Sequence, residues 1–87
     1  MIKIYYNDHF LEQIRKFNKK QQAKFTKLVV LLRENPYHPQ LHTKSLSGEL
    51  SGIYSFRISR ELRSLFKFLS ADEIILIDIG HRKDIYR

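Results

Sequence analysis

Three consecutive stretches in the second half of the chain are patterned as β-strands, and they constrain the fold more than any other feature. In residues 53–59, IYSFRIS, apolar and polar side chains alternate, as in a strand that buries one face. Residues 62–69, LRSLFKFL, follow with a similar alternation. Residues 74–79, IILIDI, are apolar on both faces, which is typical of a central strand. These patterns predict an antiparallel sheet as the main layer of the fold.

The first half of the chain predicts one further strand and two helices. Residues 2–6, IKIYY, are β-branched and aromatic and favour a strand. Either Asn7 or Asp8 can cap a helix, because a short side-chain oxygen accepts the free N–H groups of the first turn. Apolar residues fall on one helical face from Asp8 to Phe17, and a second amphipathic stretch continues to about Arg33. Two short helices with a tight junction indicate a helical hairpin laid on the sheet.

A long polar connection joins the helical hairpin to the later strands. Pro36 and Pro39 end the second helix, and residues 35–52 form a polar segment that contains two glycines. A loop of this length in a small domain is often functional. The element order β-α-α-β-β-β predicts a single α+β domain over residues 1–87, with an N-terminal strand, a helical hairpin and a curved, mainly antiparallel sheet.

Basic residues strongly outnumber acidic ones. Sixteen lysines and arginines against nine acidic residues give a formal net charge of +7, which favours a polyanionic partner such as nucleic acid, the ribosome or an acidic protein segment. The chain has no cysteine, so a disulfide framework and a thiolate metal site are excluded. No apolar run approaches the roughly 20 residues that span a bilayer, and the N-terminus lacks a signal-peptide pattern. We therefore expect a cytoplasmic protein with no membrane partner.

Period-2 geometry gathers basic and aromatic side chains at one end of the predicted sheet. Ser55 and Arg57 share one strand face, and Arg63 lies a turn's distance away on the next strand. If the last strand pairs beside this hairpin, Gly80 delivers the residues that follow it to the same end. The expected cluster contains three arginines, a histidine, a tyrosine and an acidic residue of the hairpin turn: Arg57, Arg63, Arg82, His81, Tyr86 and Glu61.

Clustered guanidinium groups have two interpretations. They are always charged and form bidentate hydrogen bonds to phosphate oxygens, so three together need a phosphate ligand or carboxylate neighbours. The alternative is ordinary surface arginine, solvated or paired with Glu49, Glu61 or Asp84. Composition alone leaves both interpretations open.

The other histidines carry weaker signals. His38 and His42 lie four apart in the proline-containing loop without a third ligand, so we expect plain loop residues and neither a metal site nor a cofactor. His9 is expected on the surface. His81 differs, because it follows a strand end and a glycine and has basic neighbours.

The second half of the chain resembles a known family. The segment LSGIYSFRISRELRSLFKF and the ending IILIDIGHRKDIYR resemble the RelE/ParE superfamily of bacterial toxin–antitoxin toxins, most strongly its RelE, YoeB and YafQ branches. The shared features are an L-x-G-x-x-S-G opening before an aromatic strand, an R-hydrophobic-x-F strand, and a G-H-R-x-x-hydrophobic-Tyr ending. The resemblance covers the whole chain in layout and residues 44–87 in motif, and it implies the same fold.

The resemblance implies a ribosome-dependent endoribonuclease that cuts mRNA in the decoding site, by attack of a ribose 2′-OH on the adjacent phosphorus. Arg57, Arg63 and Arg82 match basic positions of that family's active site, Tyr86 takes the place of its terminal aromatic residue, and Glu61 aligns with a functional acidic residue of YafQ. Such chemistry requires a proton acceptor, cations for the charged phosphorane and a donor for the leaving oxygen.

Two departures from the family leave the general base open. The paired lysines of RelE are Ser55 and Arg57 here, and an arginine is a poor proton acceptor. Lys44 stands where YoeB has a catalytic glutamate. Glu61 and His81 are then the titratable candidates, with Tyr86 as an acid or a stacking platform.

The leading hypothesis is a type II toxin: an mRNA-cleaving ribonuclease that acts in the A site of the small ribosomal subunit and is neutralised by a small acidic antitoxin. We expect a monomer when free and a hetero-oligomer with the antitoxin. Six lysines are the expected RNA-binding residues: Lys44, Lys19, Lys20, Lys24, Lys27 and Lys83. Two alternatives stay open, namely a ParE-like, non-enzymatic inhibitor of DNA gyrase and a degenerate toxin that binds antitoxin without cutting.

Overall fold

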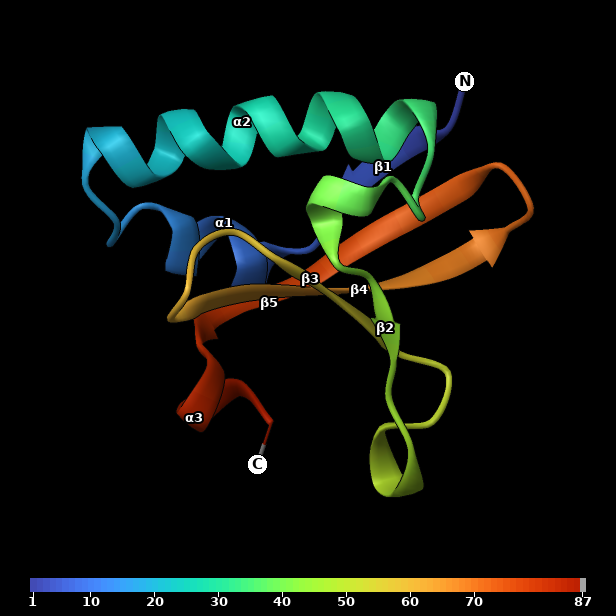
Figure 1. Cartoon of the computed structure of the whole chain (residues 1–87). Coiled ribbons are helices and arrows are strands. Elements are labelled where there is room, and N and C mark those ends of the chain that lie inside the picture. Colours follow the sequence, from blue (N-terminus) through green and yellow to red (C-terminus); the bar gives the residue numbers. More distant parts are fainter. Residues whose placement is uncertain (87) are drawn as a thin grey trace.

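One five-stranded sheet organises the computed structural model, which describes residues 1–86 (Figure 1). The strands are β1 (Lys3–Tyr6), β2 (Lys44–Ser45), β3 (Tyr54–Arg57), β4 (Leu62–Ser70) and β5 (Glu73–His81). Their spatial order is β1-β5-β4-β3-β2. β1 runs parallel to β5, and every other neighbouring pair is antiparallel. The predicted α+β fold and the central position of β5 are confirmed.

Two helices follow β1, as the sequence predicts. α1 (Asp8–Ile14) is capped by Asn7, whose side chain accepts the backbone N–H of Phe10. α2 (Lys19–Glu34) begins with a reciprocal capping box between Asn18 and Gln21. Among residues 1–86, no helix combines the length and the apolar character needed to cross a membrane.

The first helix ends earlier than predicted, at Ile14 rather than Phe17. Beyond it the backbone tightens, and the N–H of Phe17 bonds the carbonyl of Ile14. The side-chain amide of Gln22 then donates to the carbonyls of Ile14 and Phe17. A side chain from the second helix thus satisfies the open carbonyls at the junction, which hydrophobic periodicity cannot reveal.

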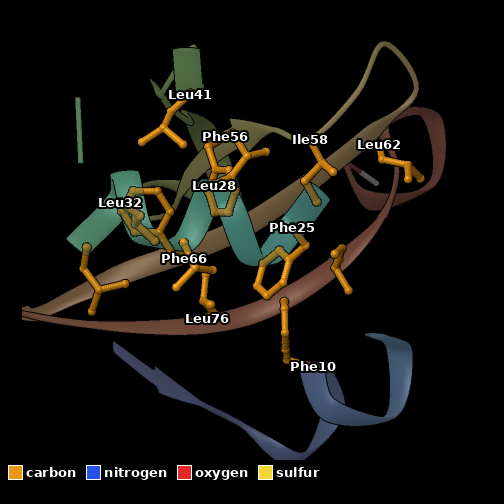
Figure 2. Close-up of a cluster of buried hydrophobic side chains, with 13 residues drawn as sticks. Phe10, Phe25, Leu28, Leu32, Leu41, Phe56, Ile58, Leu62, Phe66 and Leu76 are labelled. Atoms are coloured by element: carbon orange, nitrogen blue, oxygen red, sulfur yellow. The ribbon is translucent and has the colours of Figure 1, made fainter. Parts of the chain in front are cut away.

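The core lies between α2 and one face of the sheet (Figure 2). α2 contributes its apolar stripe, the sheet contributes Phe56, Phe66 and Leu76, and α1 contributes Phe10. Phe10, Phe56 and Phe66 are almost completely buried. Truncating one of these rings to alanine is expected to cost about 3–5 kcal/mol. The opposite face of the sheet is not covered by α2 and can carry a site.

The connection before β3 is more structured than the sequence suggests. It contains two 3₁₀ turns, η1 (Pro39–Leu41) and η2 (Gly48–Leu50), in addition to β2. Leu41 is fully buried and anchors η1 on the core. A two-residue strand shows no periodicity of its own, so its pairing with β3 was not predicted.

The chain after β5 forms a short helix, α3 (Arg82–Ile85), where the sequence predicts only a turn out of the strand. Figure 1 shows α3 on the side of β5 away from α2. Its Ile85 is buried, which holds the helix against the sheet. Four residues are too few for an amphipathic pattern to be recognised.

Candidate active site

Strand register places two arginines side by side. Arg57 on β3 lies directly opposite Arg63 on β4, and Ser55 lies opposite Lys44 on the edge strand β2. Directly opposed residues share a face of the sheet, and like charges in that position repel. Arg57 and Ser55 face away from the core, as predicted, because the intervening Phe56 is buried in it. The hairpin therefore brings two guanidinium groups together at an electrostatic cost.

The short helix α3 adds a third arginine and a tyrosine. The backbone N–H of Arg82 donates to the carbonyl of Glu61 at 2.8 Å, which ties the start of α3 to the β3–β4 turn. Arg82 and Tyr86 are four residues apart and so lie on one side of the helix. Together with the sheet residues they enclose a cavity of about 160 Å³. We call it the arginine pocket, and it is lined by His42, Lys44, Ser55, Arg57, Arg63, Arg82 and Tyr86.

Arg63 is held rigidly in this pocket. Its side chain is buried, and its Nη1 donates to the backbone carbonyls of Ser59, Arg60 and Leu62 at 2.6, 3.1 and 3.0 Å. Within residues 1–86, no acceptor is hydrogen-bonded to its Nε or Nη2. Carbonyl dipoles thus orient the guanidinium without neutralising it, and one edge of the fork remains for a ligand.

The arginine pocket has almost no counter-charge. Among residues 1–86, no acidic residue lines it, and the nearest ion pair joins Arg82 Nε to Glu61 Oε2 at 4.0 Å. Both partners are about half exposed, so this pair is weak. Within residues 1–86, neither Arg57 nor Arg63 has a carboxylate within ion-pair distance. Pairing with a carboxylate therefore accounts only for Arg82, while Arg57 is exposed to solvent and Arg63 is buried. The excess positive charge of the pocket favours an anionic ligand.

His81 does not lie in this pocket. It is opposite Leu62, and successive residues of a strand alternate between faces, so it points to the other side from Arg63. There it lines a second cavity of about 360 Å³, in which His9 Nε2 lies 3.1 Å from Asp78 Oδ1. We call this second cavity the edge pocket; its lining is His9, Gln13, Phe17, Asp78, Ile79, Gly80, His81, Asp84 and Ile85. The sequence analysis groups His81 with the arginines because it treats the residues after Gly80 as one set, whereas the register of β5 against β4 sends His81 to the opposite face.

His42 is the pocket residue that the sequence did not single out. It follows η1 and has positive backbone dihedrals (φ 50°, ψ 44°), which are uncommon for a residue other than glycine. This conformation turns the chain from η1 into β2 and places the imidazole beside the arginines. Strand periodicity gives no signal for it, because His42 lies outside the two-residue strand β2 and its positive φ breaks the alternation of strand faces.

The other candidates are spread more widely. Glu61 is exposed in the hairpin turn and reaches the pocket only through its contact with Arg82. The four lysines of α2 (Lys19, Lys20, Lys24 and Lys27) are exposed, as is Lys83 of α3. Only Lys44 of the six predicted RNA-binding lysines lines the arginine pocket. Their contacts with RNA remain a prediction.

The arrangement can bind a phosphate and a base together. Two or three guanidinium groups can surround phosphate oxygens, and the partly exposed ring of Tyr86 offers a stacking surface. The imidazole of His42 supplies a titratable nitrogen within the same cavity. Burial raises the pKa of Tyr6 and of Tyr37 above the usual 10.0, and neither tyrosine lines the arginine pocket.

Comparison with known proteins rests on structure alone, because no family model and no curated protein matches the sequence. The chain is similar to a YoeB/ParE toxin from Agrobacterium tumefaciens, with 16% identity, 93% of this chain and 99% of the other covered, and a TM-score of 0.80. It is similar to YafQ from E. coli strain BL21(DE3), with 16% identity, full coverage of both chains and a TM-score of 0.81. It also resembles the heterotetrameric YoeB–YefM toxin–antitoxin complex from Staphylococcus aureus, with 21% identity, 94% and 98% coverage and a TM-score of 0.78. The chain has the fold of the RelE/ParE superfamily of toxins.

Proposed function

We propose that this chain is the toxin of a type II toxin–antitoxin system and that it cleaves mRNA at the ribosome. The observation that carries the proposal is the arginine pocket, which gathers Arg57, Arg63 and Arg82 around one cavity without an acidic lining residue. Such a pocket matches a phosphodiester better than a neutral or cationic ligand. The fold is that of solved toxins, which supports the same assignment.

The proposed reaction is attack of a ribose 2′-oxygen on the adjacent phosphorus. A bond forms between the 2′-oxygen and phosphorus, and the bond from phosphorus to the 5′-oxygen breaks, which leaves a 2′,3′-cyclic phosphate and a 5′-hydroxyl. Arg57, Arg63 and Arg82 stabilise the negative charge that develops on the phosphorane oxygens. Arg63 is suited to this task because its backbone hydrogen bonds hold it in place before the substrate arrives.

His42 is the proposed acceptor of the 2′-hydroxyl proton. It lines the arginine pocket, whereas the candidates from the sequence, Glu61 and His81, do not. An imidazole nitrogen can accept a proton, and an ammonium or guanidinium group cannot. The departing 5′-oxygen takes a proton from water in this scheme. Tyr86 stacks on a base beside the scissile phosphate.

The proposed RNA and antitoxin partners are supported by the positive charge of the chain and by the similar solved structures. The exposed lysines of α2 and Lys83 would contact ribosomal RNA and the mRNA in the A site. An acidic antitoxin would complement the formal charge of +7, and a solved YoeB of the same fold occurs in a toxin–antitoxin complex with YefM. A monomeric free toxin, a hetero-oligomer with the antitoxin and action in the cytoplasm complete the proposal.

Mapping mRNA ends after brief induction tests this function. Wild-type protein is expected to produce new 5′ ends within translated regions, and Arg63→Ala and Arg82→Ala are expected to abolish them. Intact mRNA in wild-type cells would contradict the enzymatic proposal, and DNA damage with intact mRNA would point instead to gyrase. Unchanged cleavage in both variants would show that the site is assigned to the wrong residues.

A further inference from the structure

The arginine pocket continues into two further hollows on the α2 side of the sheet. The first, of about 330 Å³, is lined by Lys24, Leu28, Gln40, His42, Arg57, Ile58, Ser59 and Arg60. The second, of about 450 Å³, is lined by Asn18, Lys20, Gln21, Lys24, Ile58, Ser59 and Leu62. We call these two hollows together the basic groove.

Shared residues make the path continuous. His42 and Arg57 line both the arginine pocket and the first hollow. Lys24, Ile58 and Ser59 line both hollows of the basic groove. A ligand that enters at the arginine pocket can therefore pass over the end of β3 and continue between α2 and the β3–β4 turn without leaving the surface.

The chemistry of the basic groove suits a nucleic acid strand. Besides Arg57, which it shares with the arginine pocket, its cations are Lys20, Lys24 and Arg60, and among residues 1–86 no acidic residue lines either hollow. Ile58 and Leu62 lie at the bottom of the second hollow but are almost completely buried, so the groups that a ligand meets are mainly the cations and the polar side chains. Such a lining suits the phosphate backbone of a nucleic acid strand.

The path also excludes a duplex. The arginine pocket lies on the sheet face away from the core, and the basic groove lies beside α2, so a ligand must bend around the end of β3. Duplex nucleic acid resists such bending, since DNA keeps its direction over about 150 base pairs. A single strand bends freely and can follow this path.

We propose that the basic groove binds the single-stranded RNA that extends from one side of the scissile phosphate, so that the protein holds several flanking nucleotides on that side only. This inference rests on the proposed function, because the arginine pocket marks where the cut occurs. It adds Arg60 and Gln40 to the RNA-contacting residues and separates Lys20 and Lys24, which line the groove, from Lys19 and Lys27, which do not.

The test uses three oligoribonucleotides that cannot be cut, because the attacking 2′-hydroxyl is methylated. One is a short core, one is extended only on its 5′ side and one only on its 3′ side. Their affinities for the purified full chain are measured by fluorescence anisotropy over a range of salt concentrations. One extension is expected to raise the affinity roughly tenfold over the core, and the other is expected to add little, because the basic groove supplies phosphate contacts on one side only.

The variant Lys24→Gln/Arg60→Gln is expected to lose that gain while binding the short core as wild type does. For the favoured extension, the slope of log K against log salt concentration is expected to become shallower by about 1.4, since two phosphate contacts to a single strand are removed. Lys16→Gln/Arg33→Gln is the matched control, because it removes the same charges at exposed positions outside the groove. Thermal unfolding of both variants verifies that they are folded.

The outcomes separate the two proposals. Equal gains from both extensions, or an equal loss in the control variant, would overturn the groove while ribosomal mRNA cleavage still supports the proposed function. Loss of binding to an acidic antitoxin peptide without any loss of RNA affinity would also overturn it and would assign the groove to the antitoxin. Absence of cleavage in the end-mapping experiment would remove the proposed function, on which the groove depends.

Discussion

The two cavities on either side of α3 differ in how their charges are compensated. The edge pocket is the larger, at about 360 Å³ against about 160 Å³. In it, Asp78 pairs with His9 at 3.1 Å and also accepts the backbone N–H of Ile79 at 2.8 Å. In the described part of the chain, the arginine pocket is lined by several cations and by no acidic residue. Uncompensated charge, rather than volume, therefore marks the candidate active site.

A single short helix creates this contrast. Arg82 and Tyr86 line the arginine pocket, while Asp84 and Ile85 line the edge pocket. The helical turn sends residues four apart to the same side and their neighbours to the other. A set of residues adjacent in sequence is thereby divided between a cationic pocket and a cavity with internal ion pairing.

The largest expected effect comes from Arg63→Lys. Lysine keeps the positive charge but loses the planar fork and its bonds to the turn carbonyls, so cleavage on programmed ribosomes should fall roughly 10²–10³-fold. Asp78→Asn in the edge pocket is the control and should cleave at the wild-type rate. An equal loss of cleavage in both variants would show that the arginine pocket is no more important for activity than the edge pocket.

His42→Asn is expected to lower the cleavage rate about 10²-fold, because asparagine tolerates the positive φ but accepts no proton at neutral pH. Single-turnover cleavage rates of the wild type and the variant on the same programmed ribosomes provide the measurement. Full activity in this variant, with loss in His81→Asn or Glu61→Gln, would move the proton acceptor out of the arginine pocket.

Tyr86→Ala should weaken cleavage roughly tenfold through lost stacking on a base. Tyr86→Phe keeps the ring and is expected to retain nearly the full rate. Cleavage rates of both variants on the same mRNA distinguish a stacking role of the Tyr86 ring from a role of its hydroxyl. If phenylalanine proves as poor as alanine, the hydroxyl takes part in proton transfer instead.

The smallest effect is expected from His9→Gln in the edge pocket. The His9–Asp78 pair is largely exposed, so its loss should change the free energy of unfolding by less than about 1 kcal/mol. Urea denaturation measures this change, and ribosomal cleavage should stay at the wild-type rate. A marked loss of cleavage with unchanged stability would assign the edge pocket a part in function.

Several parts of the site were predictable from the sequence. Arg57 lies beside Arg63 because β3 and β4 alternate with period 2 and a short turn joins them. This placement depends only on the local hairpin. The likeness of the ending to known toxins points to Arg82 and Tyr86, and the structure brings both to the same pocket. The two helices and their caps were also local in origin, since Asn7 and Asn18 bond N–H groups only three residues away.

Other parts depended on contacts between distant segments. His42 reaches the pocket only because Leu41 is buried in the core and β2 pairs with β3. His81 leaves the pocket because its register opposite Leu62 fixes the face on which it lies. The basic groove exists only because α2 packs beside the β3–β4 turn.

The sequence by itself determined the four longer strands, the helices α1 and α2, the α+β class and the arginine pair, because hydrophobic periodicity and capping act over a few residues. The tertiary structure alone decided which histidine joins the arginines and which lysines line a continuous groove. Strand register, a four-residue helix and the seating of a loop on the core are set by long-range packing. Register matters because a shift of one residue in strand pairing places every side chain of the strand on the other face of the sheet.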